Sequence, residues 1–274
     1  MTSREPARHM TQGAKTRFAI LALQRTGTNM LGSILRKTGK VHMYGEVFYP
    51  DLGTGDLAQD LANGLFFPFW RDRIARDPRQ LMLSDPTIYD AVLADFLDRL
   101  FTQVEPGIVG IDIKSEQIEA FPRLFHLMRQ GEVRVIHLER RNYLARIVSQ
   151  LVLNHRMRAG DADVHRSVAK VPPLTIDPVT ILDWMRDDAA RNRMFHDNFA
   201  GLPDRYLHVF YEDIATDGTA LRKVFDFLGL ADEPIPPPDT VKQVPSDFAG
   251  QIANYAEVAA ALAGAGHGGF LRPA

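Results

Sequence analysis

The chain has 274 residues, 45% of them hydrophobic, and a formal net charge of -2 at pH 7. This near balance excludes a general attraction to nucleic acid or anionic membranes, so any anion site must be local. No apolar stretch approaches the roughly 20 residues of a membrane span. The absence of cysteine excludes disulfides, thiolate zinc sites and a cysteine nucleophile, and it fits a reducing compartment. We therefore expect a cytoplasmic protein, with residues 1–15 forming a disordered tail.

The first predicted unit is a strand, a turn and a helix. Residues 18–23 are an apolar run of strand length, and the polar turn Gln24-Arg25-Thr26-Gly27-Thr28 follows it. Apolar residues then recur at helical spacing, with Thr28 or Asn29 as the cap and Gly39 at the end. Such a turn directs backbone N–H groups and a helix dipole toward an anion. The turn lacks the lysine of a Walker A loop, and an ordinary β–α turn fits the pattern as well.

The rest of the chain alternates strands with helices. Further strands are predicted at residues 41–44, 107–113, 133–138 and 206–210. Helices are predicted at residues 87–104, 116–129, 143–157, 177–199 and 221–228, with an irregular region and a short helix at 51–68 and a loop or lid at 158–173. This order predicts an α/β fold in one domain, residues 16–274, with a P-loop-like parallel sheet covered by helices on both faces. His137, inside a strand, is expected to be a satisfied core histidine.

Four polar residues stand at the ends of predicted strands. They are Arg25, Glu46, Lys114 and Arg141. Because parallel sheets bind ligands beyond the carboxyl ends of their strands, we expect these side chains to converge there. Each one also has a plainer interpretation, as a solvated loop residue, a structural lysine or a surface ion pair.

Four segments resemble sulfotransferases that use 3'-phosphoadenosine-5'-phosphosulfate (PAPS). They read QRTGTNML, VIHLERRNYLARIVSQ, VFYEDIATDGTALRKVFDFLGL and VKQVPSDFAGQIANYAEVAAALAGAGHGGFL. The resemblance is closest to the bacterial carbohydrate-modifying branch, which includes nodulation-factor and trehalose sulfotransferases. It extends from residue 18 to residue 270 and is weak at 50–105 and 156–205.

The resemblance implies roles for individual residues. The first segment would hold the 5'-phosphate and the sulfuryl group through Arg25, Thr26, Gly27, Thr28 and Asn29. The second would bind the 3'-phosphate through Arg141 and Ser149, which keep the family's spacing. The third is structural, and the fourth would cover the adenosine end of the donor through Lys242, Asn254 and Tyr255.

The implied reaction is in-line transfer of the sulfuryl group to a hydroxyl of a carbohydrate, or of another small or glycolipid acceptor. Adenosine 3',5'-bisphosphate is the product, and no metal is required. The resemblance makes Glu46 the general base, while Arg25 and Lys114 would stabilise charge on the leaving phosphate. Relatives in this branch suggest a homodimer.

Two other functions stay open at this stage. A P-loop kinase-like phosphotransferase would use Mg²⁺ and ATP, with Asp112 as a metal ligand. A non-catalytic relative would bind only carbohydrate or a partner protein. The acceptor is not identified, because the aromatic residues near Glu46 suit both sugar stacking and core packing; these are Tyr44, Phe48, Tyr49 and Trp70.

Overall fold

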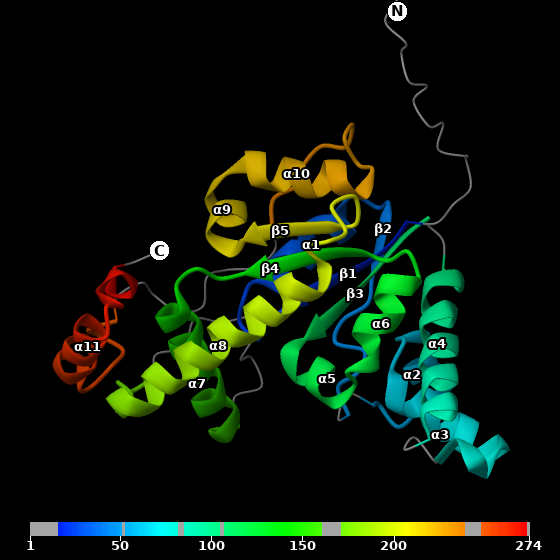
Figure 1. The fold of residues 1–274 in the computed structure, drawn as a ribbon, viewed down its shortest axis with the longest axis horizontal. Coiled ribbons are helices and arrows are strands. Elements are labelled where there is room, and N and C mark those ends of the chain that lie inside the picture. The colour runs from blue at the N-terminus through cyan, green and yellow to red at the C-terminus, as the bar shows by residue number, and fades with distance from the viewer. Residues whose placement is uncertain are drawn as a thin grey trace, which may run out of the picture.

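Five parallel strands form a single sheet at the centre of the protein (Figure 1). A computed structural model describes residues 16–50, 53–81, 85–104, 107–160, 171–238 and 248–272. The strands are β1 (Thr16–Ala22), β2 (Val41–Met43), β3 (Ile108–Lys114), β4 (Arg134–Glu139) and β5 (Tyr206–Phe210). Their order in the sheet is β2-β3-β1-β4-β5, and all four neighbouring pairs are parallel. The predicted fold class is therefore confirmed.

Helices connect these strands and cover the sheet. They are α1 (Thr28–Lys37), α2 (Leu57–Ala62), α3 (Phe66–Arg76), α4 (Pro86–Thr102), α5 (Ser115–Ala120), α6 (Arg123–Gln130), α7 (Tyr143–Arg158) and α8 (Pro178–Phe199). After β5 come α9 (Tyr211–Thr216), α10 (Gly218–Leu228) and α11 (Tyr255–Gly264), with short 3-10 helices at Pro78–Leu81 and Gly268–Leu271. Among the described helices, none is both long and apolar enough to cross a bilayer.

Strand β1 is buried on both faces, as expected for a central parallel strand. Phe18, Ile20 and Ala22 pack with α1 and α10 on one face of the sheet. Ala19 and Leu21 pack into the opposite cluster, which includes side chains of α4, α5, α6 and α8 (Figure 1). Close packing also explains a glycine in β3: a Cβ at Gly110 would lie 2.1 Å from the ring of Phe18.

A third apolar cluster lies away from these two faces. It joins α7 and the first half of α8 to the C-terminal helix α11. Leu174 and Ile252 form a parallel bridge beside this cluster. The cluster holds α7 and α8 together at the side of the molecule where α11 lies (Figure 1).

Three local predictions differ from the structure. The helix predicted at 116–129 is two helices, α5 and α6, because Pro122 forces Phe121 out of the helical region to φ -130, ψ 66. A second helix, α3, follows the short one predicted in the region 51–68. Helix α1 is capped by Gly27 and has no side-chain cap hydrogen bond, so neither Thr28 nor Asn29 caps it.

Candidate functional site

The β1–α1 turn leaves the first helical turn open to a ligand. Gly27 has φ +96, and a Cβ there would lie 2.4 Å from the Tyr211 ring, so only glycine fits. Arg25 also has a positive φ of 64, a strained conformation for a residue with a side chain. Thr26 holds the turn from inside, since its Oγ1 donates to the Leu23 carbonyl at 2.7 Å. Without a side-chain cap, the N–H groups of α1 can bind an anion.

Lys114 joins the end of β3 to this turn. Its Nζ donates to Thr28 Oγ1 at 2.5 Å and to both carboxylate oxygens of Asp112, at 2.8 and 2.7 Å. The side chain of Lys114 is buried, with 2% exposure. A buried ammonium is therefore fixed at the start of α1, where it adds to the positive field of the helix end.

Glu46, on the loop after β2, lies near Lys114 and Asp112. Its Oε2 accepts a hydrogen bond from Gln24 Nε2 at 2.8 Å. Burial raises the pKa of Glu46, while the nearby Lys114 acts in the opposite direction. The loop that carries Glu46 is tied to β3, because Asp112 N donates to the Gly45 carbonyl at 3.3 Å. The structure therefore brings Glu46, Lys114 and the turn together.

Two buried or half-buried arginines meet at the turn. Arg25 Nε donates to Ser149 Oγ on α7 at 3.1 Å. Arg140, only 9% exposed, donates from Nη1 to the Arg25 carbonyl at 3.3 Å. Burial, followed by the charges of Arg140 and Arg156, lowers the pKa of Arg25. Burial likewise lowers the pKa of Arg140, whose Nε is buried without a hydrogen-bond partner.

This arginine group has the character of an anion site. Buried positive charge is costly, and the charges of Arg140 and Arg156 disfavour the charge of Arg25. An anion bound beside these guanidinium groups would lower that cost. Arg140 and Arg156 were not predicted as site residues, and the only sequence signal for Arg140 is the Arg-Arg pair that follows β4.

Arg141 points to a different partner. Its guanidinium forms an exposed ion pair with Asp213 and lies 3.8 Å from the centroid of the Phe210 ring. Its backbone N donates to Glu212 Oε2 at 3.0 Å. Arg141 therefore sits beside the site without a described contact to the turn, whereas Ser149 of the same segment contacts Arg25 directly.

The described part of the fourth segment, residues 248–271, contacts the site only indirectly. Lys242 lies outside the described residues. The Asn254 side chain binds both backbone groups of Ile176, at 3.0 and 2.8 Å, and Tyr255 packs on the third apolar cluster. The chain end does reach the start of α7, because Asn142 Nδ2 donates to the Phe270 carbonyl at 3.0 Å. The described contacts of Asn254 and Tyr255 are thus away from the turn.

Most of the aromatic residues near Glu46 belong to the core. Tyr44 and Phe48 are 5% and 2% exposed, and Trp70 packs against the same cluster. Of the four, only Tyr49 is an exposed ring. An exposed indole stands elsewhere, at Trp184 on α8.

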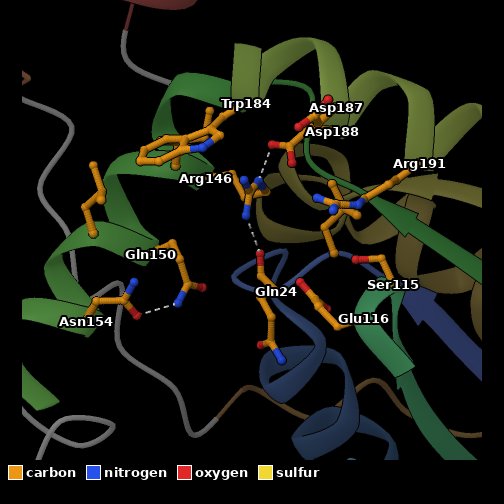
Figure 2. Close-up of a pocket in the computed structure, with 13 residues that line it drawn as sticks. Gln24, Ser115, Glu116, Arg146, Gln150, Asn154, Trp184, Asp187, Asp188 and Arg191 are labelled. Carbon is orange, nitrogen blue, oxygen red and sulfur yellow. Dashed lines mark hydrogen bonds and ion pairs between the residues drawn. The ribbon is translucent and has the colours of Figure 1, made fainter. Parts of the chain in front are cut away.

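A cavity of about 280 Å³ adjoins the turn (Figure 2). The cavity opens between α7 and α8, and Gln24 links it to Glu46. The side-chain amide of Gln24 donates to Glu46, and the backbone carbonyl of Gln24 accepts from Arg146 Nη1 at 3.3 Å. Burial raises the pKa of Asp188 to about 6, although Arg146 Nε donates to it at 2.5 Å. The lining is formed by Leu23, Gln24, Ser115, Glu116, Arg146, Ile147, Gln150, Leu151, Asn154, Trp184, Asp187, Asp188 and Arg191.

A histidine cluster on β4 and β5 is a candidate metal site. The ligand atoms of His137, Glu139 and His208 all lie within 4.8 Å of one another. His137 is fully buried, with Nδ1 on the Tyr206 hydroxyl at 2.8 Å and Nε2 on Asn192 Oδ1 at 3.2 Å. The prediction of a satisfied core histidine is confirmed.

Comparison with known proteins gives only remote similarities. No protein-family model matches the chain, and no curated protein matches it. A sulfotransferase domain from the curacin biosynthetic pathway is 14% identical over 88% of this chain and 84% of that one, with a TM-score of 0.47. A sulfotransferase from Alicyclobacillus acidocaldarius is 16% identical over 91% and 94%, with a TM-score of 0.45. Mouse sulfotransferase SULT7A1, complexed with PAP, is 14% identical over 78% and 59%, with a TM-score of 0.41. The functional argument therefore rests on the residues of the site.

Proposed function

We propose that this protein is a PAPS-dependent sulfotransferase that transfers a sulfuryl group to a hydroxyl of a small or carbohydrate acceptor. The observation that carries the proposal is the contact between Arg25 Nε and Ser149 Oγ at 3.1 Å. Arg25 belongs to the turn expected to hold the 5' end of the donor, and Ser149 belongs to the segment expected to hold its 3'-phosphate. Their contact supports the proposal, because it puts both segments within reach of one nucleotide.

The donor has two anionic ends, and the site offers cations for both. The open N–H groups of α1, with Arg25, suit the 5'-phosphosulfate. Ser149 and Arg141 suit the 3'-phosphate. To bind it, Arg141 would break its ion pair with Asp213, which costs little because exposed ion pairs are worth about 0–1 kcal/mol. Arg140 supports the turn through the Arg25 carbonyl. No metal is needed in this scheme, because protein cations balance the donor's charge.

Glu46 is the general base in the proposed reaction. The acceptor oxygen bonds to sulfur as the bond from sulfur to the bridging phosphate oxygen breaks, and the hydroxyl proton passes to Glu46. The hydrogen bond from Gln24 fixes the carboxylate, and burial raises its pKa toward the range in which a base both accepts and releases a proton. A positioned base contributes roughly 10²–10⁴-fold to such a step.

Lys114 and Arg25 stabilise the leaving group. Negative charge develops on the bridging oxygen as adenosine 3',5'-bisphosphate departs. The Lys114 ammonium is fixed beside Thr28, and Arg25 stands at the same turn. Cations held in advance where charge develops lower the barrier without reorganisation during the reaction.

The Asp112–Lys114 pair argues against the kinase alternative. A kinase of the P-loop type needs a strand-end aspartate free to hold Mg²⁺. Asp112 instead accepts two hydrogen bonds from the buried Lys114 ammonium, at 2.8 and 2.7 Å. That positive charge occupies both oxygens that a metal ion would need.

The direct test is transfer of labelled sulfate from PAPS to a panel of hydroxylated acceptors. We expect label in at least one acceptor, loss of transfer in Glu46→Gln, and unchanged transfer in the control Asp232→Asn, an exposed residue away from the site. Failure of all acceptors, together with stabilisation by Mg-ATP and none by adenosine 3',5'-bisphosphate in thermal melts, would overturn the proposal.

A further inference from the structure

We infer that the cavity between α7 and α8 binds the acceptor, and that this acceptor is a polyhydroxylated compound carrying a protonated amine. The inference rests on the proposed function, because the word acceptor has meaning only if sulfuryl transfer occurs. The recognition chemistry of the cavity is independent of the donor, and it can be measured by itself. Its evidence comes from unpaired polar atoms, from the charges of the lining and from one exposed indole.

Two buried polar atoms in the cavity wall have no partner. Ser115 is 1% exposed, yet its Oγ makes no hydrogen bond with any described residue. The same holds for Gln150 Oε1, although the Gln150 amide nitrogen donates to Asn154 at 2.8 Å. Figure 2 shows the Ser115 hydroxyl directed toward the space between Gln24, Glu116 and Arg191. Buried polar groups without partners are costly, so these atoms indicate a ligand with hydroxyl or amine groups.

The charges of the lining leave a negative excess. Glu116, Asp187 and Asp188 oppose Arg146 and Arg191, three carboxylates against two guanidinium groups. Both arginines already have carboxylate partners: Arg146 binds Asp188 at 2.5 Å, and Arg191 binds Glu119 at 2.7 Å.

Glu116 and Asp187 are the two remaining lining carboxylates, and of these Glu116 lies near enough to Arg191 for its charge to raise the pKa of that guanidinium. Neither forms a hydrogen bond or ion pair with any residue in the described part of the chain. Both are exposed, and they stand on different elements, α5 and α8. A cationic group bound at either carboxylate would gain an ion-pair partner, and an anionic acceptor there would be repelled.

Trp184 adds a flat apolar surface to this polar lining. It is 38% exposed on α8 and borders the cavity together with Gln150 of α7 (Figure 2). An indole face suits the apolar face of a sugar ring, and it also attracts a cation within about 6 Å. Carboxylates, amides and an indole around one cavity therefore favour an amino sugar or a related amino polyol.

The cavity is placed to deliver this ligand to the proposed reaction centre. Gln24 lines the cavity and binds Glu46 at 2.8 Å. Ser115, which also lines the cavity, directly follows Lys114. A hydroxyl at this end of the cavity would therefore be next to residues that contact the proposed base or adjoin the proposed leaving-group cation.

The inference is tested by calorimetric binding of three probes that share one ring. These are glucosamine, N-acetylglucosamine and glucuronic acid, at about pH 6.5, below the pKa expected of an amine. We expect glucosamine to bind at least about 10-fold more tightly than N-acetylglucosamine, which corresponds to 1.4 kcal/mol, with glucuronic acid weakest. Equal affinities, a reversed order or no binding by any probe would overturn the inference.

Charge-neutral variants identify the residues responsible. Glu116→Gln with Asp187→Asn should abolish the preference for the amine, while Asp183→Asn should leave it unchanged. Asp183 is a matched control, because it is exposed on α8, does not line the cavity and pairs with Arg186. A preference that survives the double variant, or that is lost equally in Asp183→Asn, contradicts the inference.

A parallel titration with adenosine 3',5'-bisphosphate separates the two proposals. The double variant should bind the bisphosphate like the unaltered protein. Bisphosphate binding without any preference for glucosamine would overturn the inference and leave the proposed function standing. A preference for glucosamine that depends on Glu116 and Asp187, in a protein that binds no bisphosphate, would overturn the proposed function and the role of the ligand as acceptor, and would leave the amine site itself standing.

Discussion

Two buried polar clusters lie on the same sheet, and they differ in how their charges are satisfied. In the histidine cluster every ring nitrogen of His137 has a partner, and both Glu139 oxygens are bound, by Tyr143 at 2.7 Å and by His208 at 2.9 Å. In the arginine group at the β1–α1 turn, Arg140 keeps a buried Nε without a partner. The ligand atoms of His137 and Glu139 are therefore used within the protein, whereas Arg140 Nε is left without a described partner.

This difference in hydrogen-bond partners indicates which buried polar residues serve stability and which serve ligand binding. His137, Glu139 and His208 have the residue types and spacing of a metal site, but internal hydrogen bonds already use the ligand atoms of His137 and Glu139. At the turn, by contrast, burial and the charges of Arg140 and Arg156 lower the pKa of Arg25, and Arg140 Nε is buried without a hydrogen-bond partner in the described part of the chain. We therefore expect changes in the histidine cluster to alter stability and changes around the turn to alter binding and turnover.

The largest effect is expected from Glu46→Gln. Removing the base should lower turnover by roughly 10²–10⁴-fold, with little change in affinity for adenosine 3',5'-bisphosphate. Because burial raises the pKa of Glu46 above its ordinary value and the base acts when ionised, turnover should rise as pH increases through that raised pKa. Steady-state kinetics across pH measure both effects. Unchanged turnover in the variant would remove Glu46 from the mechanism.

The histidine cluster should instead determine acid stability. Burial lowers the pKa of His137 to about 4, so between that value and the unfolded value of roughly 6.5 the unfolded chain binds more protons. Stability should therefore fall as pH decreases across this window, by up to about 3 kcal/mol.

Denaturant melts at several pH values measure this dependence. His137→Gln should reduce the pH dependence of the free energy of unfolding without altering nucleotide affinity. The exposed control His126→Gln should leave that pH dependence unchanged. An unchanged slope in His137→Gln would show that another group controls acid stability.

Arg140→Met should separate stability from binding. It removes a buried charge near Arg25 and Arg146 at the cost of one 3.3 Å hydrogen bond. Burial disfavours the charge of Arg140 more than Tyr211 and Glu212 favour it, and replacing a buried charge by an apolar group is often neutral or stabilising, so we expect the free energy of unfolding to stay equal or rise. Affinity for the bisphosphate should fall about 10-fold, or 1.4 kcal/mol. A large loss of stability would mean that Arg140 is a structural residue.

The smallest effects concern the Arg141–Asp213 pair. Arg141→Ala should weaken adenosine 3',5'-bisphosphate more than adenosine 5'-monophosphate, because only the former has a 3'-phosphate. Asp213→Asn frees Arg141 from an exposed pair worth about 0–1 kcal/mol, so bisphosphate affinity should rise by a few-fold at most. Calorimetry resolves both changes. Equal weakening of the two nucleotides by Arg141→Ala would place that side chain away from the 3'-phosphate.

Local patterns predicted most of the fold, because strands and helices follow from the period of apolar residues. The break between α5 and α6 shows where that period is insufficient: the apolar spacing continues through Phe121, and only the steric effect of Pro122 interrupts it. Likewise, α3 begins in an aromatic run whose burial against the core makes it helical, and no local signal separates that run from irregular chain.

The convergence of Arg25, Glu46 and Lys114 was predictable, because each follows or ends a parallel strand. The site was not predictable where two neighbours share a strand end, because the direction of each side chain depends on tertiary contacts. Arg140 turns inward to the Arg25 carbonyl, while Arg141 turns outward to Asp213. Trp184 and Asp187 were not predictable either, because they line the same cavity as Gln24 only through the packing of α8 on α7.

Calorimetric titration with adenosine 3',5'-bisphosphate, adenosine 5'-monophosphate and Mg-ATP tests most directly whether the arginine group is a nucleotide site. We predict that the bisphosphate binds at least about 10-fold more tightly than either of the others, and that Arg25→Ala removes most of this affinity. Tighter binding of Mg-ATP, or bisphosphate binding that is unchanged in Arg25→Ala, would contradict the assignment of the turn as the donor site.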